Sequence, residues 1–253
     1  MPNPAVSCCS GRDGVRLAHR ELGEGRPLVL LHGFTGDGTL WLLNGQAEVL
    51  AAAGRRVILP DLRGHGRSAK PQGASACPPD VPAEDGFALL DHLGLTEYDL
   101  GGYSLGARIV VRMLVRGAAP GRAAVAGQGL RQVLGTGGGA GASLRPVLTG
   151  WGTFEPGSPE ERSERWLRSG DADPVALLHV LDSLVATPAE QMGRIDVPTL
   201  VATGADDPRT ASAAELIEAL PHATGTVVPG NHWTAAGAPE LVTAIVDFLA
   251  GRR

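Results

Sequence analysis

Short, mostly apolar runs recur along the chain, and most of them are followed by a stretch with helical periodicity. The apolar runs are residues 27–31, 57–61, 98–103, 122–127, 197–203 and 224–228. Runs of this length and character are typical of strands covered on both faces of a parallel sheet. The helical stretches are residues 40–53, 82–93, the segment after Ser104, 211–220 and 238–250. Strands that alternate with helices predict an α/β fold with a mostly parallel sheet and right-handed crossovers.

The beginning and the middle of the chain depart from this pattern. Residues 13–22 alternate loosely between apolar and polar positions, as a half-buried edge hairpin does, and with it the predicted sheet has eight strands. From residue 131 to 192 the apolar runs stop, and a glycine-rich stretch at 135–141 precedes aromatic residues set among Pro, Glu and Arg. We therefore expect 131–192 to be a small helical cap, hinged at 135–141, inserted into an α/β-type core of residues 1–130 and 193–253.

Composition limits the class of protein. Glycine and proline account for 36 and 19 of the 253 residues, which approaches a low-complexity content. However, 43% of the residues are hydrophobic and only 19% are charged, which excludes a disordered chain. These residues are therefore expected to mark the turns of one large folded domain with an insert. The net charge is -5, Lys70 is the single lysine and the arginines are scattered, so no nucleic-acid partner is expected.

The three cysteines are too few and too unevenly spaced for a disulfide framework or a zinc site. The adjacent Cys8 and Cys9 are expected to be mobile and inert. No apolar run approaches the ~18 residues of a membrane span, and no basic segment followed by an apolar core indicates a signal peptide. The run 135–141 lacks the helix and acidic residue that follow a dinucleotide-binding loop. We expect a soluble cytoplasmic protein with no metal, no cofactor and no membrane partner.

Residues 102–106 form a G-x-S-x-G pentapeptide between an apolar strand and an amphipathic helix. In this context the motif predicts a sharp strand-to-helix turn that exposes the Ser104 hydroxyl beside a helix N-terminus. The flanking Gly102 and Gly106 are needed because larger side chains would collide with neighbouring elements. The pentapeptide by itself is a weak signal in a chain so rich in glycine, so its place between a strand and a helix carries the prediction.

Three further elements follow strand ends, where polar groups of a parallel sheet gather. His32-Gly33-Phe34 follows the first buried strand, and the backbone N–H groups of Phe34 and Leu105 are expected to form an oxyanion hole. Asp206 and Asp207 follow the strand at 197–203, where one carboxylate can orient a histidine and the other can cap a helix. His232 follows the last strand, and histidine is well suited to move protons at neutral pH.

Together these elements resemble the α/β-hydrolase superfamily over nearly the whole chain. The residues that carry the resemblance are His32 to Phe34, Asp61 to Ser68, the turn around Ser104, Gly204 to Asp207 and Gly230 to His232. The resemblance implies that Ser104 is the nucleophile, His232 the general base and acid, and Asp207 the orienting carboxylate. Asp207 is preferred to Asp206 because the family's acid usually stands three positions after the glycine, as Asp207 does after Gly204. It also implies a structural role for His65.

By this resemblance the leading hypothesis is a serine esterase or lactonase that cleaves a small-molecule carboxylic ester or lactone through an acyl-enzyme. Two other reactions of similar triads stay open: carbon–carbon bond hydrolysis of a diketone-type substrate, and the perhydrolysis of cofactor-free haloperoxidases. The non-enzymatic alternative is a ligand-binding receptor on a hydrolase scaffold, although a receptor has no need of an intact triad. Haloalkane dehalogenases and epoxide hydrolases of this fold often use an aspartate nucleophile, where this chain has Ser104.

The cap is expected to determine the substrate, and its residues are ambiguous. Aromatic side chains that could line an apolar pocket are Trp151, Phe154, Trp166 and, beside the predicted catalytic histidine, Trp233. The cap aromatics could equally form the core of the cap itself. Arginines that could meet a substrate carboxylate, or could lie on an exposed helix face, are Arg145, Arg162, Arg165 and Arg168.

Overall fold

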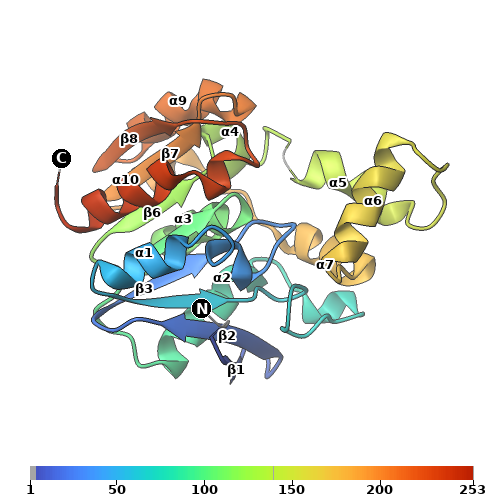
Figure 1. Ribbon diagram of the computed structural model, residues 1–253, viewed down its shortest axis with the longest axis horizontal. Helices are drawn as coiled ribbons and strands as arrows, with labels where there is room; N and C mark the ends of the chain where they lie inside the picture. Colours follow the sequence, from blue (N-terminus) through green and yellow to red (C-terminus); the bar gives the residue numbers. More distant parts are fainter. Residues whose placement is uncertain (1–3, 139, 253) are drawn as a thin grey trace.

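One eight-stranded sheet organises the molecule in the computed structural model, which describes residues 4–138 and 140–252 (Figure 1). The strand order is β1-β2-β4-β3-β5-β6-β7-β8, with antiparallel pairing of β1 with β2 and of β2 with β4, and parallel pairing elsewhere. The strands are β1 (Val6–Ser10), β2 (Arg16–Leu22), β3 (Arg26–Leu31), β4 (Arg55–Pro60), β5 (Asp99–Tyr103), β6 (Ala123–Ala126), β7 (Thr199–Gly204) and β8 (Ala223–Val228). The predicted mostly parallel α/β sheet is confirmed.

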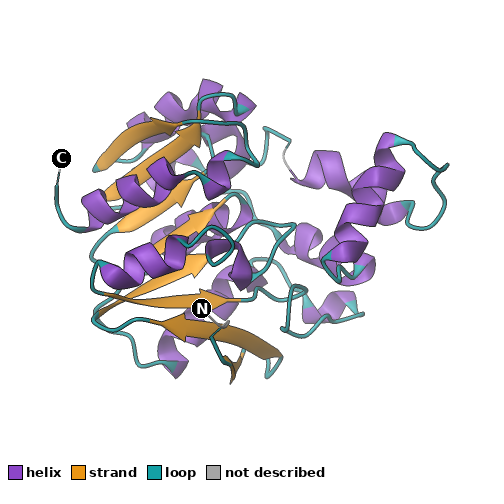
Figure 2. Ribbon diagram, in the orientation of Figure 1, coloured by secondary structure: helices purple, strands orange, loops and turns teal. Residues whose placement is uncertain are grey.

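Helices cover both faces of this sheet, so the central strands are buried on both sides (Figure 2). Alternate residues of β3 divide between two apolar cores: Leu28 and Leu30 pack in one, and Val29 and Leu31 in the other. The helices of the first core are α1 (Gln46–Ala52) and α10 (Pro239–Leu249). Those of the second are α2 (Val81–His92), α3 (Leu105–Val115) and α9 (Ala213–Ala219). This burial explains why the strands read as nearly continuous apolar runs.

Two local predictions are wrong. The hairpin expected within 13–22 begins earlier, because its first arm is β1, where Cys9 is buried against the core. The cysteine pair is therefore part of a strand rather than a mobile segment. The helix expected at 40–53 is divided into a 3-10 turn, η1 (Gly38–Trp41), and α1, because Gly45 before α1 has a φ of 70°.

The segment between β6 and β7 is helical. Its helices are α4 (Leu130–Val133), α5 (Ala140–Thr149), α6 (Pro159–Ser169), α7 (Pro174–Ser183) and α8 (Ala189–Met192). Helices α5, α6 and α7 lie to one side of the sheet, beyond the carboxyl ends of its parallel strands (Figure 1). The predicted hinge at 135–141 includes Gly139, which lies outside the described residues. The division of the chain into a core and a cap domain stays a prediction.

No helix in the described part of the chain is both long enough and apolar enough to cross a membrane.

Candidate active site

Ser104 occupies a strained turn between β5 and α3. Its backbone has a φ of 55° and a ψ of −111°, and a positive φ is uncommon for a residue with a side chain. Two backbone hydrogen bonds fix this turn: the Ser104 N–H donates to Ala126 O at 2.8 Å, and the Gly106 N–H donates to His32 O at 3.0 Å. The turn therefore joins β5 and α3 to the ends of β3 and β6, and it presents the hydroxyl at the carboxyl edge of the sheet.

The glycines on either side of Ser104 are required by close packing of backbone against backbone. A Cβ atom at Gly102 would lie 2.4 Å from the carbonyl carbon of Gly106, and one at Gly106 would lie 2.3 Å from Leu31 O. Both separations are well below van der Waals contact, and the obstructing atoms are backbone atoms that cannot rotate away. The spacing of glycines that was recognised in the sequence is thus explained by the approach of α3 to β3.

The three side chains expected to form a triad lie within hydrogen-bonding distance of one another. His232 Nε2 lies 2.9 Å from Ser104 Oγ, and His232 Nδ1 lies 2.6 Å from Asp207 Oδ2. Asp207 follows β7 and caps the 3-10 turn η3 (Pro208–Ser212), whereas His232 lies in the loop between β8 and η4 (Ala235–Gly237). Because β5, β7 and β8 run in parallel, their carboxyl ends bring together residues that are far apart in the sequence.

The structure distinguishes the two adjacent aspartates. Asp207 is buried and bonded to His232, whereas Asp206 is exposed to solvent. Burial opposes ionisation of Asp207, but hydrogen bonds from His232 and from the Arg209 N–H, together with the Arg209 charge, outweigh it, so the pKa of Asp207 is lowered. Asp207 is therefore an anion at neutral pH, and it is placed to hold the proton of His232 on Nδ1. That tautomer leaves Nε2 free to accept the proton of Ser104.

Two backbone N–H groups beside Ser104 are available to bind an oxyanion. Neither the Phe34 N–H nor the Leu105 N–H donates a hydrogen bond within residues 4–138 and 140–252. Gly33, which precedes Phe34, lies against Ser104: a Cβ atom built on Gly33 would be 3.5 Å from the Ser104 Cβ. The loop from β3 and the first turn of α3 thus flank the Ser104 hydroxyl, as an oxyanion hole requires.

Two buried histidines hold the loop that carries the Phe34 N–H. His32 Nδ1 lies 2.7 Å from Gly33 O, and His32 Nε2 accepts a hydrogen bond from the Leu62 N–H at 2.9 Å. Since Gly33 O and the Phe34 N–H belong to one planar peptide group, the bond to Gly33 O turns the N–H the opposite way. His65 Nε2 lies 2.7 Å from Phe34 O. The structural role expected for His65 therefore extends to the geometry of the site.

Acid is expected to destabilise the protein through this histidine pair. Burial lowers the pKa of both His32 and His65 to about 4, so between the unfolded value of 6.5 and about 4 only the unfolded chain binds these protons. The contribution of the two histidines to the free energy of unfolding should thus be fully present above pH 6.5. It should decrease by up to about 3 kcal/mol per histidine as the pH falls towards 4. Chemical denaturation between pH 7.5 and 5 measures the slope. Carboxylates whose ordinary pKa values are near 4 contribute little in that range.

The slope should be shallower in the variant His65→Gln than in the unmodified protein, because one of the two buried imidazoles is removed. An unfolding free energy that does not change with pH, or a slope that His65→Gln leaves unchanged, would contradict the assignment of neutral buried histidines.

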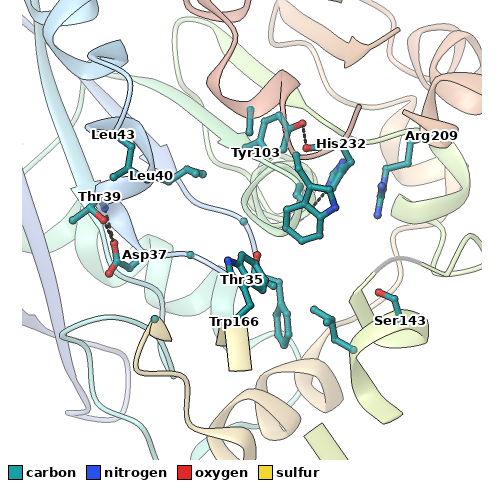
Figure 3. Close-up of a pocket in the computed structure, with 18 residues that line it drawn as sticks. Thr35, Asp37, Thr39, Leu40, Leu43, Tyr103, Ser143, Trp166, Arg209 and His232 are labelled. Carbon is teal, nitrogen blue, oxygen red and sulfur yellow. Dashed lines mark hydrogen bonds between the residues drawn. The ribbon is translucent and has the colours of Figure 1, made fainter. Parts of the chain in front are cut away.

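A cavity of about 290 Å³ opens beside Ser104 and His232 (Figure 3). Its wall combines the β3 loop, η1, the turn between β5 and α3, helices α5 and α6, and the segments that follow β7 and β8. Trp166 on α6 and Trp233 beside His232 both line it, and their rings meet edge to face with centroids 5.3 Å apart. The ring of Trp233 also meets that of His232, with centroids 5.8 Å apart. A contact between the inserted helices and the loop that carries His232 thus borders the cavity.

The other two predicted pocket aromatics lie elsewhere. Trp151 and Phe154 are absent from the described wall of the cavity and pack against the apolar core instead. The Trp151 ring is covered by the Arg168 guanidinium, whose carbon lies 4.6 Å from the ring centroid, and Phe154 packs over Gly150. This packing fits the other role that the sequence allowed for the two rings, as part of the core of the inserted helices.

Sequence reasoning missed two further residues of the site. The Tyr103 hydroxyl donates a hydrogen bond to the backbone O of His232 at 2.6 Å and so supports the loop that carries the histidine. Tyr103 precedes Ser104 in the pentapeptide, so its position was a usable signal. Arg209 lines the cavity and its Nη1 donates to Asp207 Oδ1 at 3.1 Å. Its role depends on the course of η3, which leaves no distinctive pattern in the sequence.

No group of three or more His, Cys, Asp and Glu side chains that could bind a metal ion is present among the described residues.

Comparison with known proteins agrees with the fold. Residues 26–125, which include Ser104 and both predicted oxyanion donors, match the family described as alpha/beta hydrolase fold. The crystal structure of bromoperoxidase from Bacillus anthracis superposes with a TM-score of 0.78 at 25% identity, covering 97% of this chain and 100% of that chain. The chain therefore has the α/β-hydrolase fold.

Two curated relatives each match just over two fifths of the chain. The dihydrolipoyllysine-residue acetyltransferase component of the acetoin cleaving system from Pseudomonas putida is 47% identical over 106 residues, which are 41% of this chain and 27% of that protein. A non-heme chloroperoxidase from Kitasatospora aureofaciens is 34% identical over 108 residues, which are 43% of this chain and 38% of that protein. The matched segments therefore span well under half of each relative.

Proposed function

We propose that this protein is a serine hydrolase that cleaves a small carboxylic ester or lactone through an acyl-enzyme. The single observation that supports it best is the continuous hydrogen-bonded series Ser104–His232–Asp207 at the edge of the cavity. Serine is a weak nucleophile by itself, and it attacks a carbonyl efficiently when an adjacent base takes its proton. A series of three such groups has the geometry that this activation requires.

In the proposed first step, Ser104 Oγ attacks the substrate carbonyl carbon while His232 Nε2 accepts the hydroxyl proton. The negative charge that develops on the carbonyl oxygen is bound by the Phe34 and Leu105 N–H groups. The imidazolium formed at His232 is stabilised by the buried Asp207 carboxylate. Collapse of the tetrahedral intermediate breaks the bond to the leaving oxygen, which receives the proton from His232.

In the second step, water replaces the leaving group. His232 takes a proton from the water as its oxygen attacks the acyl carbon, and then returns that proton to Ser104 as the acid product leaves. Each step thus begins and ends with a neutral His232 and an ionised Asp207. A lactone follows the same sequence, except that the leaving oxygen stays on the acyl chain as a hydroxyl group, so deacylation releases a single hydroxy acid.

We also propose that residues 131–192 act as a cap that selects the substrate. The support is that Ser143 and Leu144 on α5 and Trp166 on α6 line the same cavity as Ser104. Trp166 and Trp233 are the proposed apolar contacts, since both border the cavity and both remain partly exposed.

Perhydrolysis is a second candidate, favoured by the likeness of the whole chain to a structure named bromoperoxidase and by the chloroperoxidase relative. The same acyl-enzyme would then be attacked by hydrogen peroxide instead of water and would release a peracid. The two reactions differ only in the second nucleophile, so partition of an acyl-enzyme between water and added peroxide compares them directly.

A fluorophosphonate probe and 4-nitrophenyl esters test the proposal together. We expect the probe to label the protein at one equivalent, with the added mass on the peptide that contains Ser104, and the labelled protein to lose turnover of 4-nitrophenyl acetate and butyrate. A receptor on the same scaffold would bind small ligands without turnover. Labelling at another residue, or full ester turnover after labelling of Ser104, would overturn the proposed nucleophile.

A further inference from the structure

The cavity carries opposite charges at its two ends. Arg209 is the one arginine or lysine in the wall formed by the described residues, and Asp37 is the one carboxylate. They lie on opposite sides of the cavity, with Asp37 in the loop before η1 and Arg209 beside His232 (Figure 3). The carboxylate of Asp37 accepts hydrogen bonds from the Thr39 N–H at 2.7 Å and from the Thr39 hydroxyl at 2.5 Å. The Asp37 carboxylate therefore already has hydrogen-bond donors within its own turn.

At the basic end, Arg209 has N–H groups that do not donate to an acceptor among the described residues. Of the five N–H groups of a guanidinium, Arg209 directs one, from Nη1, to Asp207. Its Nε is buried and has no hydrogen-bond partner among the described residues. A buried donor without an acceptor is costly, and in a native structure it points to a partner outside the chain, either an ordered water or a ligand. In Figure 3 the guanidinium end of Arg209 lies beside His232 and extends towards Ser143, across the open cavity.

Three arginines of the inserted helices are already paired with carboxylates. Arg145 pairs with Asp182 at 2.8 Å, Arg165 pairs with Glu161, and Arg168 pairs with Glu164 and covers Trp151. None of these side chains lines the cavity within the described residues. They form the exposed helix faces that the sequence allowed, so the cation that faces the cavity comes from the core and not from the cap.

We propose that Arg209 binds a carboxylate of the substrate, so that the natural ester or lactone is an anion such as the half-ester of a dicarboxylic acid. A guanidinium donates charge-assisted hydrogen bonds to a carboxylate, and the contact with Asp207 leaves Nη2 of Arg209 without an acceptor among the described residues. Asp37, at the opposite end of the cavity, repels a negative charge. The substrate therefore binds with its carboxylate at Arg209, and this orientation leaves the scissile carbonyl near Ser104. This inference rests on the proposed function and adds the charge of the substrate to it.

Matched pairs of anionic and neutral esters test the proposal. One pair, mono-4-nitrophenyl glutarate and 4-nitrophenyl pentanoate, differs by a carboxylate on the acyl side; the other, 3-acetoxypropanoate and propyl acetate, differs by one on the alcohol side. We expect the protein to prefer the anionic member of at least one pair by about 10-fold or more in kcat/KM, as a charge-assisted hydrogen-bond pair provides.

The readout for Arg209→Met is the ratio of kcat/KM for the anionic ester to that for the neutral one. Arg209 also contacts Asp207, so its loss can slow both esters alike, and the ratio cancels that shared effect. We expect the ratio to fall by about 10- to 100-fold in Arg209→Met, mainly through KM, and to be partly retained in Arg209→Lys. The matched control Arg168→Met, which removes a cap arginine outside the cavity wall, should leave the ratio as it is.

Ratios near one for both pairs in the unmodified protein, or a ratio that Arg209→Met does not change, would overturn the carboxylate site while leaving the proposed hydrolase intact. If no ester is turned over and no probe labels Ser104, the hydrolase proposal fails instead. Calorimetric titration of Ser104→Ala with the glutarate half-ester still tests Arg209 in that case. A Kd about 10-fold or more higher when Arg209→Met is added supports the site, and an equal Kd overturns it.

Discussion

Replacing Ser104 with alanine is expected to lower kcat for 4-nitrophenyl butyrate by about 10⁴-fold or more, while the fold is retained. The variant Ser104→Ala removes the only atom of the proposed triad that forms a covalent bond to the acyl group, so the acyl-enzyme route is closed. The oxyanion donors at Phe34 and Leu105 and the His232–Asp207 pair remain, and they support only a small residual rate. Steady-state kinetics measure the loss, and thermal unfolding should shift by about 2 °C or less.

Ser143→Ala is the matched control, because Ser143 also lines the cavity but lies on α5, across from His232 in Figure 3. We expect this variant to retain at least a tenth of the activity. Equal loss of activity in the two variants, or persistence of turnover in Ser104→Ala, would show that the hydroxyl of Ser104 is not the nucleophile.

Replacing Asp207 with asparagine is expected to lower kcat by about 10³- to 10⁴-fold at neutral pH. The side chain keeps its size, but it loses the charge that stabilises the imidazolium of His232. Its amide group can also donate to His232 Nδ1, which favours the tautomer with the proton on Nε2. A protonated Nε2 cannot accept the proton of Ser104. Fluorophosphonate labelling should slow in parallel with ester turnover, because both depend on an activated Ser104.

The neighbouring aspartate provides the control. Asp206 is exposed and contributes its backbone N–H to Gly230 O, a bond that Asp206→Asn preserves. We expect that variant to differ from the parent by no more than about threefold in kcat/KM, an effect typical of exposed positions. A large loss in Asp206→Asn together with near-normal activity in Asp207→Asn would reverse the assignment of the orienting carboxylate.

The strands of the central sheet could be predicted from the sequence because burial on both faces makes each strand a continuous apolar run. Val29 and Leu31 face one core and Leu28 and Leu30 the other, so the run 27–31 must be apolar at every position. The edge hairpin was harder to predict, since Cys9 is the one buried residue of β1 and the strand shows little apolar periodicity. Likewise, the periodicity of 40–53 continues across Gly45, although the positive φ of that glycine separates η1 from α1.

The predicted triad could be named because each member follows the end of a strand, and topology brings such ends together. The residues that line the cavity could not be predicted, because amphipathic periodicity shows that a side chain is buried without showing which residues it contacts. Trp151 and Trp166 look alike in the sequence, yet one packs within the inserted helices and the other borders the cavity. Arg209 depends on the turn after Asp207, a tertiary detail with no periodic pattern.

The positive φ of Ser104 has a thermodynamic consequence. Such a conformation costs about 1–2 kcal/mol for a residue with a side chain, and the surrounding structure must offset it. Here the restraint comes from the two backbone hydrogen bonds to Ala126 and His32, which link α3 and β5 to the neighbouring strands. Loosening of these strand ends would let Ser104 relax to an ordinary backbone conformation while the rest of the sheet stayed folded. Loss of catalytic competence would then precede global unfolding, so activity would report the local order of this junction and not the stability of the whole domain.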